Sequence, residues 1–335
     1  MSESETPDSL RDELRSAWYR YLDLIAPMRP ALHAYCRRLT RTLWDAEDLV
    51  QDTLLRAFGH LGFINHTIRN PRAYLLRTAT NVWIDELRRR ERETPTAQTD
   101  RAEAATRGDD PETSSKVRAA GARLLQRLSP QERAAVLLKE MFEMTLDEIA
   151  ELLATTTGAV KAALHRGRER LREPEGGTAS RRPVPSPELL DRFVERYDAK
   201  DLHGLAGLLL DGASVENVGE ALQFGRETFE RTRLNILWHV VNGHAEWPPQ
   251  LQPESVRLQR VEYEGEPILL SFTSSRGREA LFAAYRVEEQ DGRIARLRIY
   301  GFCPETMRAL GDAFGVRVVT GLYHAPEPEL KWRAT

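Results

Sequence analysis

The sequence predicts a multidomain protein in which two all-α domains precede an α+β unit. Residues 10–92 and 117–172 show helical apolar spacing with few glycines. Two polar segments, 93–116 and 173–187, contain almost no bulky apolar residue and read as linkers, the first of them flexible and acidic. The region 188–320 contains four short runs of β-forming residues. A chain of 335 residues also exceeds what one hydrophobic core usually organises.

Composition narrows the class of protein. With 41% hydrophobic and 30% charged residues the chain is neither disordered throughout nor rich in disulfides. The two cysteines, Cys36 and Cys303, are far apart and belong to no metal-binding cluster, so we expect neither a metal nor a cofactor. The polar start and the absence of a long apolar run predict a cytoplasmic protein that does not enter a membrane. Because the net charge is −3, any nucleic-acid binding has to come from local segregation of charge.

The second helical block carries the pattern of a helix-turn-helix. Residues 129–132 (SPQE) form a capping box with proline at the first helical position, and residues 145–148 (TLDE) repeat the device. A short polar segment, 154–157, then interrupts the pattern before a third helix opens near Gly158. Two short helices, a tight turn and a third helix are typical of this motif.

The third helix combines a buried row with a cationic row. Val160, Leu164, Gly167 and Leu171 recur at helical spacing and face inward. A parallel row contains Lys161, His165, Arg168 and Arg172, and five bases against one acid give residues 158–172 a charge of about +4. Such a helix suits the DNA major groove, with Thr156, Thr157 and Lys161 near base edges. The alternative is a solvated basic face on a structural helix.

The first helical block contains an acidic helix that begins with Asp45 as its cap. Its apolar stripe leaves a polar outer face formed by Glu47, Asp48, Gln51, Asp52 and Arg56. An acidic face repels DNA and suits a protein partner, although ordinary helix solvation explains it equally well.

A longer helix opens at Asn70-Pro71 and becomes strongly basic. Between Arg69 and Arg92 seven arginines oppose three acids. This many arginines, next to Asn81, suit contact with a nucleic-acid backbone and unpaired bases. We expect Trp83 to lie in the core rather than to act as a stacking platform.

Together these motifs resemble a bacterial sigma factor of the extracytoplasmic-function group, within the sigma-70 family. The resemblance rests on DAEDLVQD at 45–52, on NPRAYL at 70–75 with Asn81 and residues 85–90, and on LSPQER at 128–133 with GAVK at 158–161. It implies that the acidic helix docks on core RNA polymerase and that the basic helix with its preceding loop captures the minus-ten promoter element. The helix-turn-helix then reads the minus-thirty-five element. The function implied is promoter recognition and DNA opening in transcription initiation.

The resemblance also assigns residues. For the minus-thirty-five element it implies Thr156, Thr157, Lys161, His165, Arg166 and Arg168. For the minus-ten element it implies Asn65, Arg77, Asn81, Arg88, Arg89 and Arg90. For polymerase binding it implies Asp45, Glu47, Asp48, Gln51, Asp52 and Arg56. The sequence departs from the family after Lys161, where Ala162 and Ala163 replace the usual serine and arginine.

The C-terminal part, 188–320, resembles a SnoaL-like cone, in which a curved antiparallel sheet surrounds a pocket. Its predicted strands are 256–263, 268–273, 280–288 and 293–300, with Asp291-Gly292 as a hairpin turn. The resemblance implies a regulatory domain that modulates initiation, with a small ligand as a candidate occupant of its pocket. We expect no catalytic site of its own, because His239, His244 and Asp211 have no diagnostic spacing.

Two other functions fit the same residues. One is a ligand-sensing helix-turn-helix regulator that binds duplex DNA without polymerase. The other is an enzyme fused to a DNA-binding remnant, with His239 or Asp211 as the proton shuttle.

Overall fold

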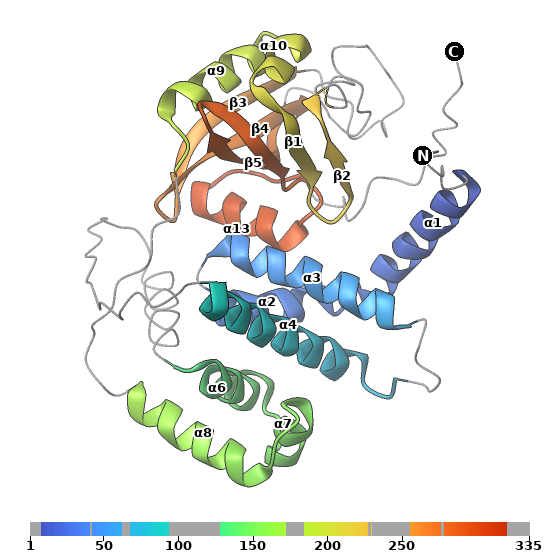
Figure 1. The fold of residues 1–335 in the computed structure, drawn as a ribbon, viewed down its shortest axis with the longest axis vertical. Helices are drawn as coiled ribbons and strands as arrows, with labels where there is room; N and C mark the ends of the chain where they lie inside the picture. The colour runs from blue at the N-terminus through green and yellow to red at the C-terminus, as the bar shows by residue number, and fades with distance from the viewer. Residues whose placement is uncertain are drawn as a thin grey trace. The chain divides into compact units, whose positions relative to one another are not determined.

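The computed structural model shows helical modules and a mixed-sheet domain (Figure 1). Its Cα positions divide into two compact units, residues 23–181 and residues 1–22 with 182–335. The structure describes residues 8–40, 42–61, 68–93, 128–171, 184–226, 229, 255–275 and 278–319. Most of the two predicted linkers therefore lies outside the described residues.

The unit 23–181 consists of two helical modules. The first helical module comprises α2 (Arg29–Leu39), α3 (Leu43–Leu61) and α4 (Pro71–Glu93), which pack around fully buried Tyr35 and Trp44. The helix α4 begins at Pro71 as predicted, and the Asn70 side chain caps it by accepting a hydrogen bond from the Ala73 amide at 3.0 Å. The helix α3 begins at Leu43, before the predicted start, because Thr42 rather than Asp45 takes the capping position: its hydroxyl accepts from the Asp45 amide at 3.0 Å.

The second helical module is the predicted helix-turn-helix. It comprises α6 (Pro130–Phe142), α7 (Leu146–Leu152) and α8 (Thr157–Arg170), and both predicted capping boxes are present. Gly167 lets α8 approach α6 closely, since a Cβ atom at this position would lie 3.0 Å from a methyl group of Val136. Because Gly167 lies against α6, the opposite side of α8 faces away from α6.

The C-terminal domain contains an open six-stranded sheet in the order β2-β1-β6-β5-β4-β3. The four predicted strands appear as an antiparallel meander, and the Asp291-Gly292 turn between the last two has both residues at positive φ. The sequence did not predict β1 or β2, and β1 pairs with β6 in parallel, so the sheet as a whole is mixed. The strands are β1 (Leu209–Asn217), β2 (Ala221–Phe224), β3 (Ser255–Tyr263), β4 (Glu266–Ser275), β5 (Arg278–Gln290) and β6 (Arg293–Ile299).

Three helices accompany this sheet: α9 (Pro187–Asp198), α10 (Leu202–Gly207) and α13 (Pro304–Phe314). The helix α9 buries Phe193 and Tyr197 in a core shared with Tyr285 and other strand residues. Within this apolar core the Tyr197 hydroxyl forms hydrogen bonds with Ser271 at 3.0 Å and with Tyr285 at 3.4 Å. None of the helices in the described residues is long and apolar enough to cross a membrane.

The N-terminal helix α1 (Asp8–Ile25) joins the C-terminal domain through its residues up to Leu22. Arg15 forms an ion pair with Glu220 in the β1–β2 turn, and the Tyr19 hydroxyl donates to the same carboxylate at 2.6 Å. The Trp18 indole donates to the Gly219 carbonyl at 3.4 Å. The sequence placed residues 10–22 with the first helical domain, and these long-range polar contacts explain the different grouping.

Candidate nucleic-acid and polymerase interface

The outer face of α8 carries the predicted cations. Lys161, His165 and Arg168 are exposed, whereas Val160 and Leu164 are buried against the other helices of the module. The capping residue Thr156 is exposed and accepts a hydrogen bond from the Ala159 amide at 3.1 Å, and Thr157 is half-buried. The exposed side chains thus form one cationic face that starts at a helix N-terminus, the geometry that a groove-reading helix needs.

Arg166 differs from Lys161 and Arg168 because its partner is a buried carboxylate. Its guanidinium donates to Glu132 of α6 at 3.0 Å, and Arg170 pairs with the same carboxylate. Burial alone would raise the pKa of Glu132, but hydrogen bonds from Ser129 and Arg166 and the charge of Arg170 outweigh it and lower that pKa. Arg168 also has a partner, the exposed Glu140 at 2.6 Å. Arg166 therefore helps to hold α8 on α6, while 54% of its side chain stays exposed.

The outer face of α4 presents a second cationic surface. Arg77, Asn81 and Arg88 are exposed and lie on one side of the helix, as their spacing of four and seven residues requires. Asp85 lies on the same face, 3.3 Å from Arg56 of α3 and 3.9 Å from Arg88. Arg88 keeps 63% of its side chain exposed despite this contact.

Of the three other residues predicted to contact the minus-ten element, the structure describes the side chain of Arg89 alone. Arg89 pairs with Glu86 one turn earlier at 2.9 Å. The backbone of Arg90 is helical, but its side chain lies outside the described part of the chain, and so does the whole of Asn65. Trp83 is buried, which confirms the expectation of a core residue.

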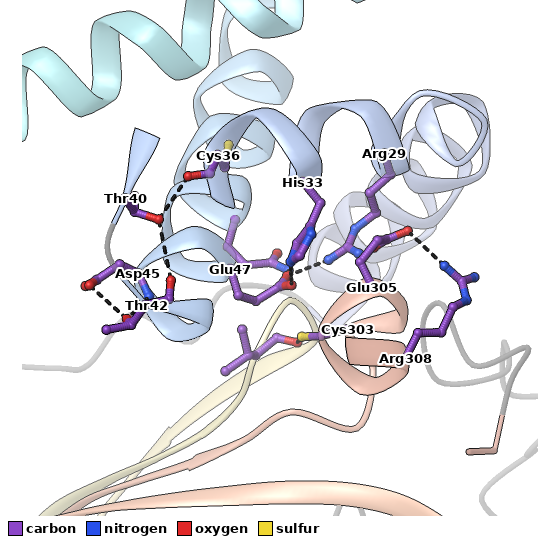
Figure 2. Close-up of polar contacts among 12 residues, drawn as sticks. Arg29, His33, Cys36, Thr40, Thr42, Asp45, Glu47, Cys303, Glu305 and Arg308 are labelled. Atoms are coloured by element: carbon purple, nitrogen blue, oxygen red, sulfur yellow. Dashed lines mark hydrogen bonds and ion pairs between the residues drawn. The ribbon is translucent and has the colours of Figure 1, made fainter. Parts of the chain in front are cut away.

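The prediction that Glu47 and Gln51 lie on the outer face of α3 was wrong. Glu47 is fully buried, where it pairs with Arg29 of α2 and approaches His33 at 3.8 Å (Figure 2). Gln51 is also buried and donates to the Glu47 carboxylate at 2.7 Å. Because the Glu47 carboxylate binds both the Arg29 guanidinium and the Gln51 amide, neither charge of the pair is buried without an opposite charge. A charge pattern alone could not distinguish this cluster from a solvated face.

The remaining predicted polymerase-binding residues lie nearer to solvent. Asp52 and Arg56 are exposed, and Asp48 is partly exposed. Asp45 is partly exposed and accepts a hydrogen bond from the Thr42 hydroxyl at 2.8 Å (Figure 2). Next to Asp52 on the helix, Leu55 exposes 56% of its surface. Sequence reasoning missed Leu55, although its place outside the apolar stripe could have identified it.

Asp211 does not fit the role of a proton shuttle in the C-terminal domain. Its side chain is 86% exposed and lies 3.5 Å from Arg226. A shuttle of this kind requires a buried carboxylate or imidazole. The other candidates, His239 and His244, lie outside the described residues.

Comparison with known families matches both helical modules. The family model for Sigma-70 region 2 matches residues 24–93, and the model for Sigma-70, region 4 matches residues 122–171. The first match ends with α4, and the second contains the helix-turn-helix. The two matches follow each other in the order that the motifs predict.

Several curated proteins are similar to about half of the chain. The ECF RNA polymerase sigma factor SigG of Mycobacterium tuberculosis is 36% identical over 213 residues, which cover 54% of this chain and 57% of SigG. The chain thus spans little more than half the length of this relative. The RNA polymerase sigma-E factor of Streptomyces avermitilis is 34% identical over 152 residues, covering 45% of this chain and 82% of that protein. Among solved structures, SigJ of M. tuberculosis aligns with a TM-score of 0.32 and 22% identity, covering 85% of this chain and 98% of SigJ.

Proposed function

Because the chain belongs to the extracytoplasmic-function group of the sigma-70 family, we propose that it binds core RNA polymerase in the cytoplasm, confers promoter specificity and promotes DNA opening. In this proposal the face of α4 contacts the minus-ten element and the face of α8 contacts the minus-thirty-five element. The protein itself supplies no catalytic step.

The observation that carries the proposal is the presence of two separate cationic helix faces. Arg77 and Arg88 belong to the region 2 match, and Lys161 and Arg168 belong to the region 4 match. Because the net charge of the chain is negative, attraction to DNA has to come from local cationic surfaces such as these two faces. A regulator that binds duplex DNA alone would need only one of these faces.

The polymerase contact is assigned to the exposed part of α3. Asp52 supplies charge and Leu55 supplies an apolar anchor next to it. Interfaces draw most of their affinity from such an anchor surrounded by polar groups, and charges steer the encounter.

Co-purification with core RNA polymerase tests this assignment. The full chain should bind the core enzyme, and Asp52→Lys should weaken binding at least tenfold without changing the far-UV circular dichroism spectrum. Glu195→Lys, the same reversal on an exposed turn of α9, is the matched control and should bind like the wild type. Tight duplex binding by a chain that never binds the core enzyme would instead support the regulator.

The C-terminal domain is assigned a modulating role. Its contact with the N-terminal helix supports this role. Arg15 and Tyr19 both bind Glu220, and they lie in the helix that directly precedes the first helical module in sequence. Glu220→Ala should therefore change the amount of transcript made with core polymerase, and Arg15→Ala should act through the same contact. Unchanged transcription in both variants would contradict this coupling.

A small ligand in the C-terminal domain remains part of the proposal. The Thr273 hydroxyl on β4 is buried and has no hydrogen-bond partner among the described residues. Thr273 lies two residues from Ser271, which forms a hydrogen bond with Tyr197. Buried hydroxyls of this kind usually have partners, so a ligand hydroxyl or carbonyl would fit there. Thermal-shift screening with small polar organic compounds tests this ligand site. A compound that raises the melting temperature of the wild type should not raise that of Thr273→Val.

A further inference from the structure

The two helical modules are joined by a buried arginine. Arg133 of α6 is only 8% exposed, and its guanidinium donates to the carbonyl of Leu39, the last residue of α2. The same guanidinium lies over the ring of Trp83 on α4, 5.1 Å from the ring centroid. A helix C-terminus and an aromatic face both attract a cation. The Leu39 carbonyl and the Trp83 ring of the first module therefore both stabilise the Arg133 guanidinium.

A second set of contacts lies at the other end of α6. Phe142, the last residue of this helix, packs edge-on against Tyr35 of α2 with ring centroids 5.6 Å apart. The guanidinium of Arg72 on α4 lies 5.0 Å from the centre of the Phe142 ring. Both ends of α6 thus contact the first module, which fixes its direction as well as its position.

This packing conflicts with simultaneous contact to two promoter elements. The names of the elements place them roughly 25 base pairs apart, which is about 85 Å along B-form DNA at 3.4 Å per base pair. A compact unit of about 160 residues has a radius of gyration of only about 15 Å. The faces of α4 and α8 are exposed while the modules are packed, so each can meet DNA alone but not both elements together.

We propose that Arg133 is a clamp that holds the two helical modules in a closed state, and that its release from Leu39 and Trp83 is a required step before both promoter elements are bound. The proposal rests on the initiation role given above. The chain between the modules is long enough for this step: about 34 residues separate Glu93 from Leu128, and such a length spans at most about 110 Å.

The distance between the modules tests the clamp directly. Spin labels at Gly59→Cys on α3 and Glu151→Cys on α7, both exposed positions, report this distance in the full chain without DNA or polymerase. The native Cys36 and Cys303 are buried, and the parent chain measures their background labelling. Wild type should show one narrow distribution, and Arg133→Leu should shift the closed-to-open ratio at least tenfold toward longer distances.

Two further variants keep the test decisive. Arg168→Leu removes an exposed arginine that pairs with Glu140 within the second module, and its distance distribution should match the wild type. Arg133 also donates to Leu128 in its own module at 3.3 Å, so Trp83→Leu tests the clamp while leaving α6 unchanged and should also open the chain. A wild-type distribution in folded Arg133→Leu and Trp83→Leu would overturn the proposal.

Assembly on promoter DNA provides the second measurement. If release must precede contact with both promoter elements, less Arg133→Leu than wild type should half-saturate core RNA polymerase on genomic DNA fragments, by about the factor by which the variant opens. Opening with an unchanged half-saturating concentration would contradict the clamp as a barrier to promoter binding. Opening in a chain that never binds the core enzyme would instead refute the initiation role, so the two failures are distinguishable.

Discussion

The Arg166 guanidinium donates to the Glu132 carboxylate at 3.0 Å, so one of the arginines expected at DNA also links α8 to a buried carboxylate of α6. The same carboxylate accepts the Ser129 amide in the capping box of α6 at 3.0 Å. A single acidic side chain therefore joins the start of α6 to the end of α8. Arg166 and Arg170 of α8 thus bind a buried carboxylate, whereas Lys161 and His165 lie on the exposed cationic face.

This division predicts different results for two substitutions on α8. Arg166→Ala should destabilise the second helical module by about 1–3 kcal/mol, because it removes a charged hydrogen bond to a buried carboxylate. Lys161→Ala should leave stability unchanged and reduce the salt slope of duplex binding by about one unit. Thermal unfolding and salt-titrated DNA binding of both variants measure this. An unaltered slope in Lys161→Ala would contradict groove docking.

The pH dependence of the second module should follow Glu132. Its pKa in the folded protein lies below the ordinary 4.5, so the carboxylate stabilises the fold above the unfolded pKa, and this contribution is lost as pH falls through the folded pKa. Glu132→Gln should therefore be less stable than wild type near neutral pH and approach it in acid. Hydrogen exchange of α6 and α8, corrected for intrinsic rates, measures the difference. A gap that widens in acid would exclude this cause.

The buried cluster around Glu47 predicts a loss of stability rather than of partner binding. Glu47→Ala leaves the Arg29 guanidinium buried without its charge partner, which costs about 3–5 kcal/mol. Replacing both residues, Arg29→Met with Glu47→Leu, should restore most of the stability because no lone charge remains. Chemical unfolding of the wild type and the two variants tests this. A double variant no better than the single one would show that the cluster matters for another reason.

Close packing at Gly167 predicts that alanine is unfavourable there. The added Cβ would lie 3.0 Å from a Val136 methyl group, and the stiff β-branched side chain of Val136 has little room to rotate away. Overpacking of this kind costs about 1–3 kcal/mol, more than the helix propensity gained. Gly167→Ala should lower the melting temperature, and Val136→Ala in the same chain should recover part of it. Additive losses would contradict direct contact.

The helical modules could be predicted from local signals. Capping boxes at Ser129 and Thr145 and the Asn70-Pro71 start act within one turn of helix, so the sequence alone reveals them. Long β-forming runs and the Asp291-Gly292 turn identified four strands in the same way. The strand β1 was missed because its first half, LLDGA, mixes apolar residues with turn formers and its pairing with β6 is distant in sequence.

The errors in the candidate site arose from long-range pairing. Glu47 and Gln51 have the polarity of surface residues, and only the position of Arg29 on another helix explains their burial. Arg133 likewise resembles a surface arginine until its partner, the Leu39 carbonyl, is known. Periodicity reports which face of a helix is apolar, but it does not report which charges pair across helices.

Initiation in a defined system tests the central role most directly. Core RNA polymerase and the full chain are incubated with fragmented genomic DNA from the source organism, and the 5′ ends of the transcripts are mapped. We expect starts absent with core enzyme alone and preceded by two sequence motifs at constant spacing, with the upstream motif losing its influence in Lys161→Ala. Starts that do not differ from those of the core enzyme alone would contradict the assignment of this chain as an initiation factor.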